Sequence, residues 1–264
     1  MRFAPWIEER DMWHVISIIF GAMIGSFLNV CIHRLPKEES IARPGSHCPK
    51  CKTPIRFYDN IPLLSYLLLR GKCRYCQASI SIQYPIVEAI TALSSFFLFI
   101  TFGVSLSFFY YFSFLAALIA ITVIDLFHQI IPDVISLPGI VIGLLGSLVI
   151  PQITFWSSLI GVLSGGGSLF LVATVYQWLF KREGMGGGDV KLLAMIGAFL
   201  GWKAVILTIL LSSFIGSIIG ITVMLIKGKD FKYAIPFGPF LALGAVISLF
   251  CGENLISWYL YINR

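Results

Sequence analysis

The sequence predicts an all-α polytopic membrane protein with about eight transmembrane segments and a small cytoplasmic zinc-ribbon-like loop domain. Its 264 residues are 58% hydrophobic and only 12% charged, whereas soluble chains carry about 25% charged residues. Long stretches contain no Asp, Glu, Lys or Arg: 12–33, 89–124, 134–180, 204–226 and 233–252. Since a span needs roughly 20 mostly apolar residues, the longest stretches hold two spans, or one span and a re-entrant piece.

The predicted segments are 12–32, 85–103, 106–124, 134–150, 155–180, 189–201, 203–226 and 234–251. Gly103 and Pro151 divide two of the stretches, because glycine and proline interrupt helical continuity. The segment 189–201 is short for an unthinned bilayer, so it is either partly embedded or one interrupted unit with its neighbour. The chain then divides into a first membrane span (1–32), a cytoplasmic zinc-binding loop domain (33–83) and a membrane-embedded core (84–264).

A basic loop sets the predicted orientation. The net charge is +6, and residues 34–74 hold nine Lys/Arg against three Asp/Glu, which accounts for the whole excess. Short basic loops stay in the cytoplasm, and this explanation is favoured over a nucleic-acid patch. We therefore expect membrane lipid and no nucleic acid as partner. With eight segments, both termini lie outside, and two further connections return to the cytoplasm with basic residues: Lys181, Arg182, Lys227, Lys229 and Lys232.

Four cysteines in the basic loop form two C-x-x-C pairs. Cys48 and Cys51 are separated from Cys73 and Cys76 by 21 residues. This arrangement is typical of a tetrahedral structural zinc site, in which each pair supplies two thiolates and no position is open to water. The alternative is two disulfides, which rarely persist in the cytoplasm. Two further cysteines, at positions 31 and 251, lie in apolar segments and are expected to pack there.

Pairs of glycines four residues apart are expected to let helices approach closely in lipid. The pairs are Gly21/Gly25, Gly139/Gly143, Gly161/Gly165 and Gly216/Gly220. They predict helix packing and indicate no particular function.

Four acidic residues lie inside or at the edge of apolar segments, where a charge is costly and by default indicates function: Glu88, Asp125, Asp133 and Asp189. The predicted topology places Asp125 and Asp189 at the same cytoplasmic edge, as a catalytic pair requires. Asp133 follows a proline and is expected to be the N-cap of the next helix. Glu88 is expected to favour a helix N-terminus, and Asp189 has the same cap alternative.

A run of three glycines, Gly186, Gly187 and Gly188, precedes Asp189. Such a run costs helix entropy and permits close backbone approach, which favours more than a simple cap. It does not match a phosphate-binding loop, because Asp189 stands where a third glycine is needed and no Gly-Lys-Ser/Thr follows. A zinc protease is excluded as well, since no H-E-x-x-H occurs and the four histidines are scattered, at 14, 33, 47 and 128.

The run Gly186-Gly187-Gly188-Asp189 resembles the G-x-G-D signature of membrane aspartic proteases, and residues 183–192 resemble its version in bacterial type IV prepilin peptidases. Asp125 with Ile131-Pro132-Asp133 is similar to the family's other aspartate motif. Further segments are similar to its N-terminal, loop and second-span signatures: Gly25-Ser26-Phe27-Leu28-Asn29-Val30 followed by Arg34 and Pro36, Asn60-Ile61-Pro62, Ser65-Tyr66-Leu67, and Tyr84-Pro85-Ile86-Val87-Glu88. The resemblance covers residues 20–200 approximately.

The resemblance implies a membrane aspartic endopeptidase of the bacterial cytoplasmic (inner) membrane, with its active site facing the cytoplasm. Its substrates would be prepilins or pseudopilins of a type IV pilus, type II secretion or competence system, cut after a glycine just before their apolar N-terminal helix. Many members also methylate the new amino group with S-adenosylmethionine. That activity is generally tied to the N-terminal part, here the first span and the loop through Cys76.

An aspartic mechanism needs one ionised and one protonated carboxyl group. Asp189 at a helix N-terminus is expected to be the base, and Asp125 near a helix C-terminal end is expected to be the acid. Two other functions remain open. A zinc-containing membrane transporter would use the aspartates as cation sites, and a non-catalytic assembly factor would use the basic loop for docking.

Overall fold

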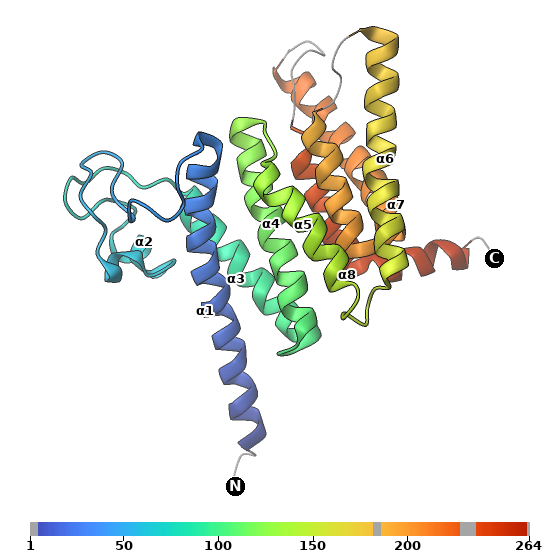
Figure 1. The fold of residues 1–264 in the computed structure, drawn as a ribbon. Helices are drawn as coiled ribbons and strands as arrows, with labels where there is room; N and C mark the ends of the chain where they lie inside the picture. The colour runs from blue at the N-terminus through green and yellow to red at the C-terminus, as the bar shows by residue number, and fades with distance from the viewer. Residues whose placement is uncertain (1–4, 182–185, 228–235, 263–264) are drawn as a thin grey trace. The chain divides into compact units, whose positions relative to one another are not determined.

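A computed structural model describes residues 5–181, 186–227 and 236–262, and it confirms an all-α fold. The helices are α1 (Pro5–Arg34), α2 (Leu64–Leu68), α3 (Gln83–Phe102), α4 (Leu106–His128), α5 (Asp133–Gly146), α6 (Phe155–Phe180), α7 (Gly187–Lys227) and α8 (Gly238–Ile262), with short 3-10 turns η1 (Leu35–Lys37) and η2 (Phe57–Asn60) (Figure 1). Two compact units are formed, Met1–Ala120 and Ile121–Arg264, so α4 contributes its first part to one and its end to the other.

Six described helices, α1, α3, α4, α6, α7 and α8, are long and apolar enough to cross a membrane. The predicted number was eight, and two elements account for the difference. Helix α5 has only 14 residues, or about 21 Å at 1.5 Å per residue, which is less than a bilayer core of about 30 Å. Helix α7 counts once, although it contains both predicted segments 189–201 and 203–226.

Helix α7 is interrupted at Gly201. Its backbone there has φ 79° and ψ 174°, outside the helical region, and only glycine adopts such a conformation at little cost. The break lies where the sequence predicted the boundary between two segments. Beyond it, α7 runs antiparallel to α8, because Thr208 packs against Gly244 whereas Gly216, further along α7, packs against Phe240. The Lys227 end of α7 therefore approaches the start of α8.

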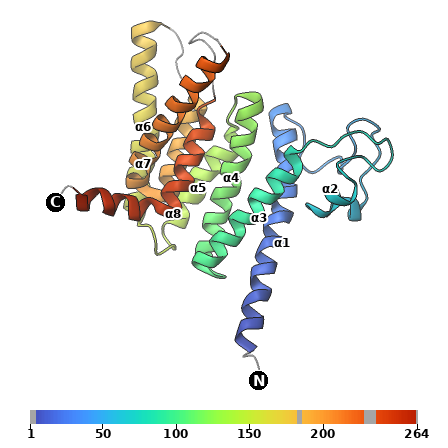
Figure 2. The same ribbon diagram turned by 180° about the vertical axis from the view of Figure 1, so that it is seen from behind.

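In the N-terminal unit, α1 and α3 pack as an antiparallel pair (Figure 2). Three of the predicted glycine pairs lie at close helix contacts. A Cβ on Gly21 or Gly25 would meet α3, one on Gly139 or Gly143 would meet α7, and one on Gly161 or Gly165 would meet the α7 backbone. In the fourth pair, a Cβ on Gly216 would lie 3.4 Å from the Phe240 ring, which is a van der Waals contact.

The loop between α1 and α3 is tied to both helices by buried polar groups. The Arg34 guanidinium, at the end of α1, donates to the backbone oxygens of Ser40 and Pro44. The Glu88 carboxylate accepts the backbone N–H of Leu63 at 2.7 Å. The sequence predicted that Glu88 interacts with the N-terminus of its own helix, and this prediction is wrong. Glu88 lies beyond the first turn of α3 and binds the loop instead.

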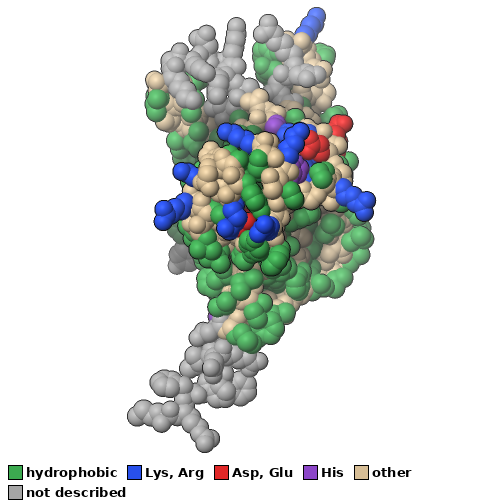
Figure 3. All heavy atoms as spheres, turned by 90° about the vertical axis from the view of Figure 1, so that its left-hand side faces the viewer, with side chains coloured by type: hydrophobic (Ala, Val, Ile, Leu, Met, Phe, Trp, Pro, Cys, Tyr) green, Lys and Arg blue, Asp and Glu red, His purple; other side chains and the backbone are tan. Residues whose placement is uncertain are grey.

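Lys and Arg side chains gather on the face that carries this loop (Figure 3). One of them, Arg74, forms an ion pair with Asp59 at 2.6 Å, and this contact holds the pKa of Asp59 below its usual range. The basic character predicted for residues 34–74 is thus a property of a folded surface.

Candidate active site and metal centre

The four loop cysteines converge on one point. Their sulfur atoms all lie within 4.8 Å of one another, with Cys48 Sγ 3.8 Å from Cys76 Sγ and Cys51 Sγ 4.0 Å from Cys73 Sγ. A tetrahedral zinc with Zn–S bonds of 2.3 Å holds its sulfurs about 3.8 Å apart. The described cysteines are free thiols, so the geometry favours metal binding over the disulfide alternative.

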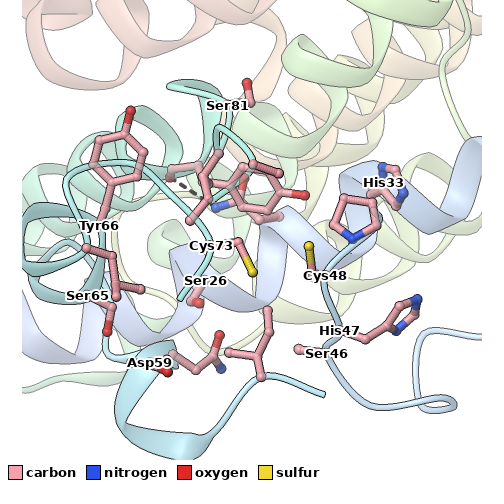
Figure 4. Close-up of a pocket in the computed structure, with 18 of the residues that line it drawn as sticks. Ser26, His33, Ser46, His47, Cys48, Asp59, Ser65, Tyr66, Cys73 and Ser81 are labelled. Carbon is pink, nitrogen blue, oxygen red and sulfur yellow. Dashed lines mark hydrogen bonds between the residues drawn. The ribbon is translucent and has the colours of Figure 1, made fainter. Parts of the chain in front are cut away.

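Each cysteine pair adopts the same local structure. An isolated antiparallel bridge flanks each pair, between His47 and Pro54 and between Lys72 and Ser79. In each pair the first cysteine's N–H bonds to a carbonyl five residues ahead, and its carbonyl accepts an N–H from four residues ahead. These turns point both sulfurs of a pair inward, and Figure 4 shows Cys48 and Cys73 pointing into the same space.

The turns favour the thiolate form at two of the four cysteines. Hydrogen bonds from the Thr53 side chain and backbone lower the pKa of the Cys51 thiol to about 6. Backbone N–H groups of Cys76 and Tyr75 lower the pKa of Cys73. The pKa of the Cys76 thiol is instead raised to about 11, in part by desolvation and by hydrogen bonds with the neighbouring cysteines. Since metals bind the deprotonated form of cysteine, two of the four thiols are prepared for a metal ion by the loop itself.

In the C-terminal unit, Asp125 lies in the last turn of α4 and is only 5% exposed. Its Oδ2 accepts the backbone N–H of Gly238, the first residue of α8, at 3.1 Å. A Cβ on Gly238 would lie 2.5 Å from that oxygen. The carboxylate is therefore held against the N-terminus of α8, where the helix dipole and a free N–H favour negative charge.

Asp189 lies in the first turn of α7, half-buried, and Ile131 connects it to the Asp125 site. A Cβ on Gly188 would lie 2.8 Å from Ile131 Cβ, and the same side chain packs against Gly238. Ile131 therefore lies both against the residue before Asp189 and against the residue that binds Asp125. Both ends of α7 thus lie near the start of α8, which means that the chain reverses direction at Gly201.

The roles of the two aspartates stay a prediction, and two observations bear on them. Helix α4 continues past Asp125 to His128, so Asp125 lies inside the last turn and not beyond the end of the helix. In addition, Gly238 supplies a donor that favours the ionised form of Asp125. Among the described residues, no donor contacts the Asp189 carboxylate. Glu183, which belongs to the resembling run, lies outside the described residues, as do Arg182, Lys229 and Lys232.

Asp133 does not cap α5. The residue before the helix is Pro132, and no side-chain capping bond is formed. Instead, the Asp133 carboxylate accepts two bonds from Lys191 Nζ, at 2.7 and 2.8 Å. This exposed pair links the start of α5 to the first turn of α7 and leaves Asp133 with its charge already compensated.

The three glycines before Asp189 have different surroundings, which predicts different effects of adding a methyl group. Gly188→Ala should destabilise the folded protein by roughly 1–3 kcal/mol, because its Cβ would overpack against Ile131. Gly187→Ala is the matched control, since nothing lies within 4 Å of its Cβ position. Thermal unfolding should shift only for Gly188→Ala. An equal loss of stability in both variants would contradict the close contact.

Sequence reasoning missed Gly238, and it named Ile131 only as part of a motif without its contacts. The run Pro236-Phe237-Gly238-Pro239 is a helix-interrupting signal inside the predicted segment 234–251, and α8 starts within it. This Pro-x-Gly-Pro run predicts that a helix starts here. The sequence does not indicate that the new helix begins beside the Asp125 carboxylate.

A cavity of about 670 Å³ lies in the N-terminal unit between the end of α1, the cysteine loop and the start of α3 (Figure 4). Its lining combines apolar, aromatic and polar side chains, including Ser26, Asn29, Tyr84 and Glu88. Asn29 Oδ1 is buried without a hydrogen-bond partner among the described residues. The volume and lining are typical of small-molecule sites.

Comparison with known families matches two consecutive parts of the chain. Residues 19–102 match the bacterial peptidase A24 N-terminal domain. Residues 112–221 match the type IV leader peptidase family. The first match covers α1, the cysteine loop and α3, and the second includes both aspartates.

Curated relatives match almost the whole chain. Proteins named prepilin leader peptidase/N-methyltransferase from Aeromonas salmonicida and Pseudomonas aeruginosa are each 38% identical, covering 97% and 92% of this chain and 95% and 92% of their own lengths. The Neisseria gonorrhoeae protein of the same name is 36% identical, covering 93% of this chain and 94% of its own length. No solved structure matches significantly.

Proposed function

Because the chain belongs to the type IV leader peptidase family, we propose that it is a membrane aspartic endopeptidase that removes the leader peptides of prepilins or pseudopilins. The observation that carries this proposal is that Ile131 packs against Gly188, next to Asp189, and against Gly238, which binds the buried Asp125 carboxylate. The two aspartates therefore lie near the same point of the C-terminal unit. A peptide bond placed between two such groups meets a base and an acid together.

In the proposed mechanism, Asp125 is the ionised base and Asp189 the protonated acid. The N–H of Gly238 and the start of α8 stabilise the carboxylate of Asp125, which takes a proton from the attacking water. Asp189 donates its proton to the carbonyl oxygen or leaving amine. Infrared absorption of a protonated carboxyl group should therefore disappear in Asp189→Asn and persist in Asp125→Asn.

Incubation of the purified protein with a prepilin tests the activity directly. Mass spectrometry of the product should show a new N-terminus immediately after a glycine, and an added methyl group when S-adenosylmethionine is present. An intact prepilin after prolonged incubation with a correctly folded enzyme would contradict the proposal and favour a transport or assembly role.

We also propose that the four loop cysteines hold one structural zinc ion. All ligand positions are filled by sulfur, so the ion would stabilise the loop and take no part in cleavage. The basic surface of this loop would face the cytoplasm next to anionic lipid headgroups, at the bacterial inner membrane.

The purified protein should contain about one zinc per chain, by the ligand count of a structural site. Cys73→Ser should reduce the zinc content severely, because it removes one of four ligands. Cys251→Ser is the matched control, since this cysteine is exposed and lies outside the cluster. Metal analysis of both variants decides the question, and full zinc retention by Cys73→Ser would contradict the site.

The cavity beside the cysteine loop supports a second activity, methylation of the new N-terminus. A volume of about 670 Å³ suits a methyl donor such as S-adenosylmethionine, and the mixed apolar, aromatic and polar lining supports this proposal. When bound, the sulfonium supplies an activated methyl group. The residues of this unit would bind it and position the acceptor.

A further inference from the structure

Asn29 and Glu88 form a buried polar pair on the wall of this cavity. Both side chains line it, although Asn29 is only 3% and Glu88 only 7% exposed. Asn29 Nδ2 donates to the Tyr84 carbonyl at 3.1 Å. Because a carbonyl can only accept, this bond fixes the amide orientation, and the oxygen without a partner is Oδ1.

Glu88 has acceptor capacity to spare. An ionised carboxylate can accept about four hydrogen bonds. The described donors are the Leu63 N–H and the Ser26 side chain. The buried Asn29 Oδ1 has no partner among the described residues and loses free energy unless a ligand supplies a donor. The buried Glu88 carboxylate has partners and can accept further bonds.

The two acceptors lie about one helical turn apart. Gly25 of α1 packs directly on Glu88, since its Cβ would lie 2.7 Å from Glu88 Cα. Asn29, four residues along α1, contacts Tyr84, four residues back along α3. In an antiparallel helix pair these are successive layers, separated by roughly 5–6 Å. One small group with several N–H donors can bridge them.

We propose that Asn29 and Glu88 bind the α-ammonium group of the processed substrate as the methyl acceptor. An ammonium group carries three donors and no acceptor, and its positive charge matches the Glu88 carboxylate. This inference rests on the proposed methylation. Asn29 lies five residues before the end of α1 at Arg34, and Glu88 lies five residues after the start of α3 at Gln83. The pair is therefore near the polar ends of two apolar helices, where a substrate with an apolar N-terminal helix would present its terminus.

The pair also accounts for the proton that methylation releases. Glu88 takes one proton from the substrate ammonium, which leaves a neutral amine held by Asn29 Oδ1. The nitrogen lone pair then forms the N–C bond to the methyl group while the C–S bond of the sulfonium breaks and its electron pair returns to sulfur. The products are a methylated ammonium, a neutral thioether and a protonated Glu88, so charge and atoms balance.

Binding without methyl donor tests this inference directly. The probe is a fluorescent peptide with the apolar N-terminal sequence of a mature pilin, compared with its N-acetylated form, on the full-length protein in detergent. Wild type should bind the free-amine peptide at least about tenfold more tightly, consistent with a buried charged contact. Glu88→Gln should reduce this preference to about twofold or less, and methylation should fall at least about tenfold.

Glu88→Gln retains an acceptor for the Leu63 N–H, so the loop should keep its fold. Zinc content and leader cleavage within about twofold of wild type would show that it does.

Glu39→Gln is the matched control. Glu39 lines the same cavity but is exposed, so removing its charge should leave the amine preference intact. Loss of the preference in both variants would indicate a general charge effect and overturn the inference.

Two further results separate the possible failures. If Glu88→Gln weakens binding of S-adenosylmethionine and leaves the peptide preference unchanged, the pair binds the ammonium of the methyl donor and the inference is wrong. If wild type cleaves prepilin without methylating it, the proposed methylation fails while cleavage stands. An unchanged amine preference in Glu88→Gln overturns the inference in either case.

Discussion

Asp125→Asn and Asp189→Asn should each lower leader-peptide cleavage by about 10³-fold or more, because each removes one of two groups that must exchange protons with the substrate. The loss should appear in kcat, since the amide keeps the size of the side chain. The rate of prepilin cleavage by protein purified from the membrane fraction is the measurement.

Asp133→Asn is the control for these variants. Its carboxylate is exposed and paired with Lys191, and surface ion pairs contribute about 0–1 kcal/mol. Cleavage should therefore change by less than about fivefold. Normal cleavage by a folded Asp125→Asn or Asp189→Asn variant would rule out the aspartic mechanism.

Gly238→Ala should lower cleavage by about 10²-fold, although no catalytic group is removed. The new Cβ would lie 2.5 Å from Asp125 Oδ2 and 3.2 Å from its Cγ, so the carboxylate must move. A displacement of about 1 Å in an active site can cost that much in rate. Gly238 is a positioning residue, and its effect should appear in kcat while the protein remains folded.

Gly252→Ala is the matched control in the same helix. Its Cβ would meet Leu207 at 3.7 Å, an ordinary van der Waals distance, so cleavage should stay within about twofold of wild type. Equal losses in both variants would mean that α8 tolerates no alanine in general, and that Gly238 has no specific relation to Asp125.

Much of this fold follows from local patterns. Uncharged stretches locate the helices because a membrane admits few charges, and Gly103 and Gly201 mark real interruptions, each with positive φ. The cysteine spacing predicted one cluster because each C-x-x-C pair forms its own turn. Such features depend on residues close together in the sequence.

Features that depend on distant residues could not be predicted in the same way. Asp133 and Lys191 are 58 residues apart, and Gly238 and Asp125 are 113 residues apart. Whether a carboxylate caps its own helix or binds another is decided by packing, which the local pattern does not contain. The proposed roles of Asp125 and Asp189 depend on such a contact, because the donor to Asp125 comes from α8.

The contact between Gly161 of α6 and Gly197 of α7 has a genetic consequence. A Cβ at either position would overlap the backbone of the other helix. Every single-base change in a glycine codon that alters the residue introduces a side chain with a Cβ. Codons 161 and 197 therefore have no tolerated one-step missense neighbour. A mutational scan selecting for folded protein should leave both positions without accepted variants, whereas codon 187, where nothing lies within 4 Å of the Cβ position, should accept alanine.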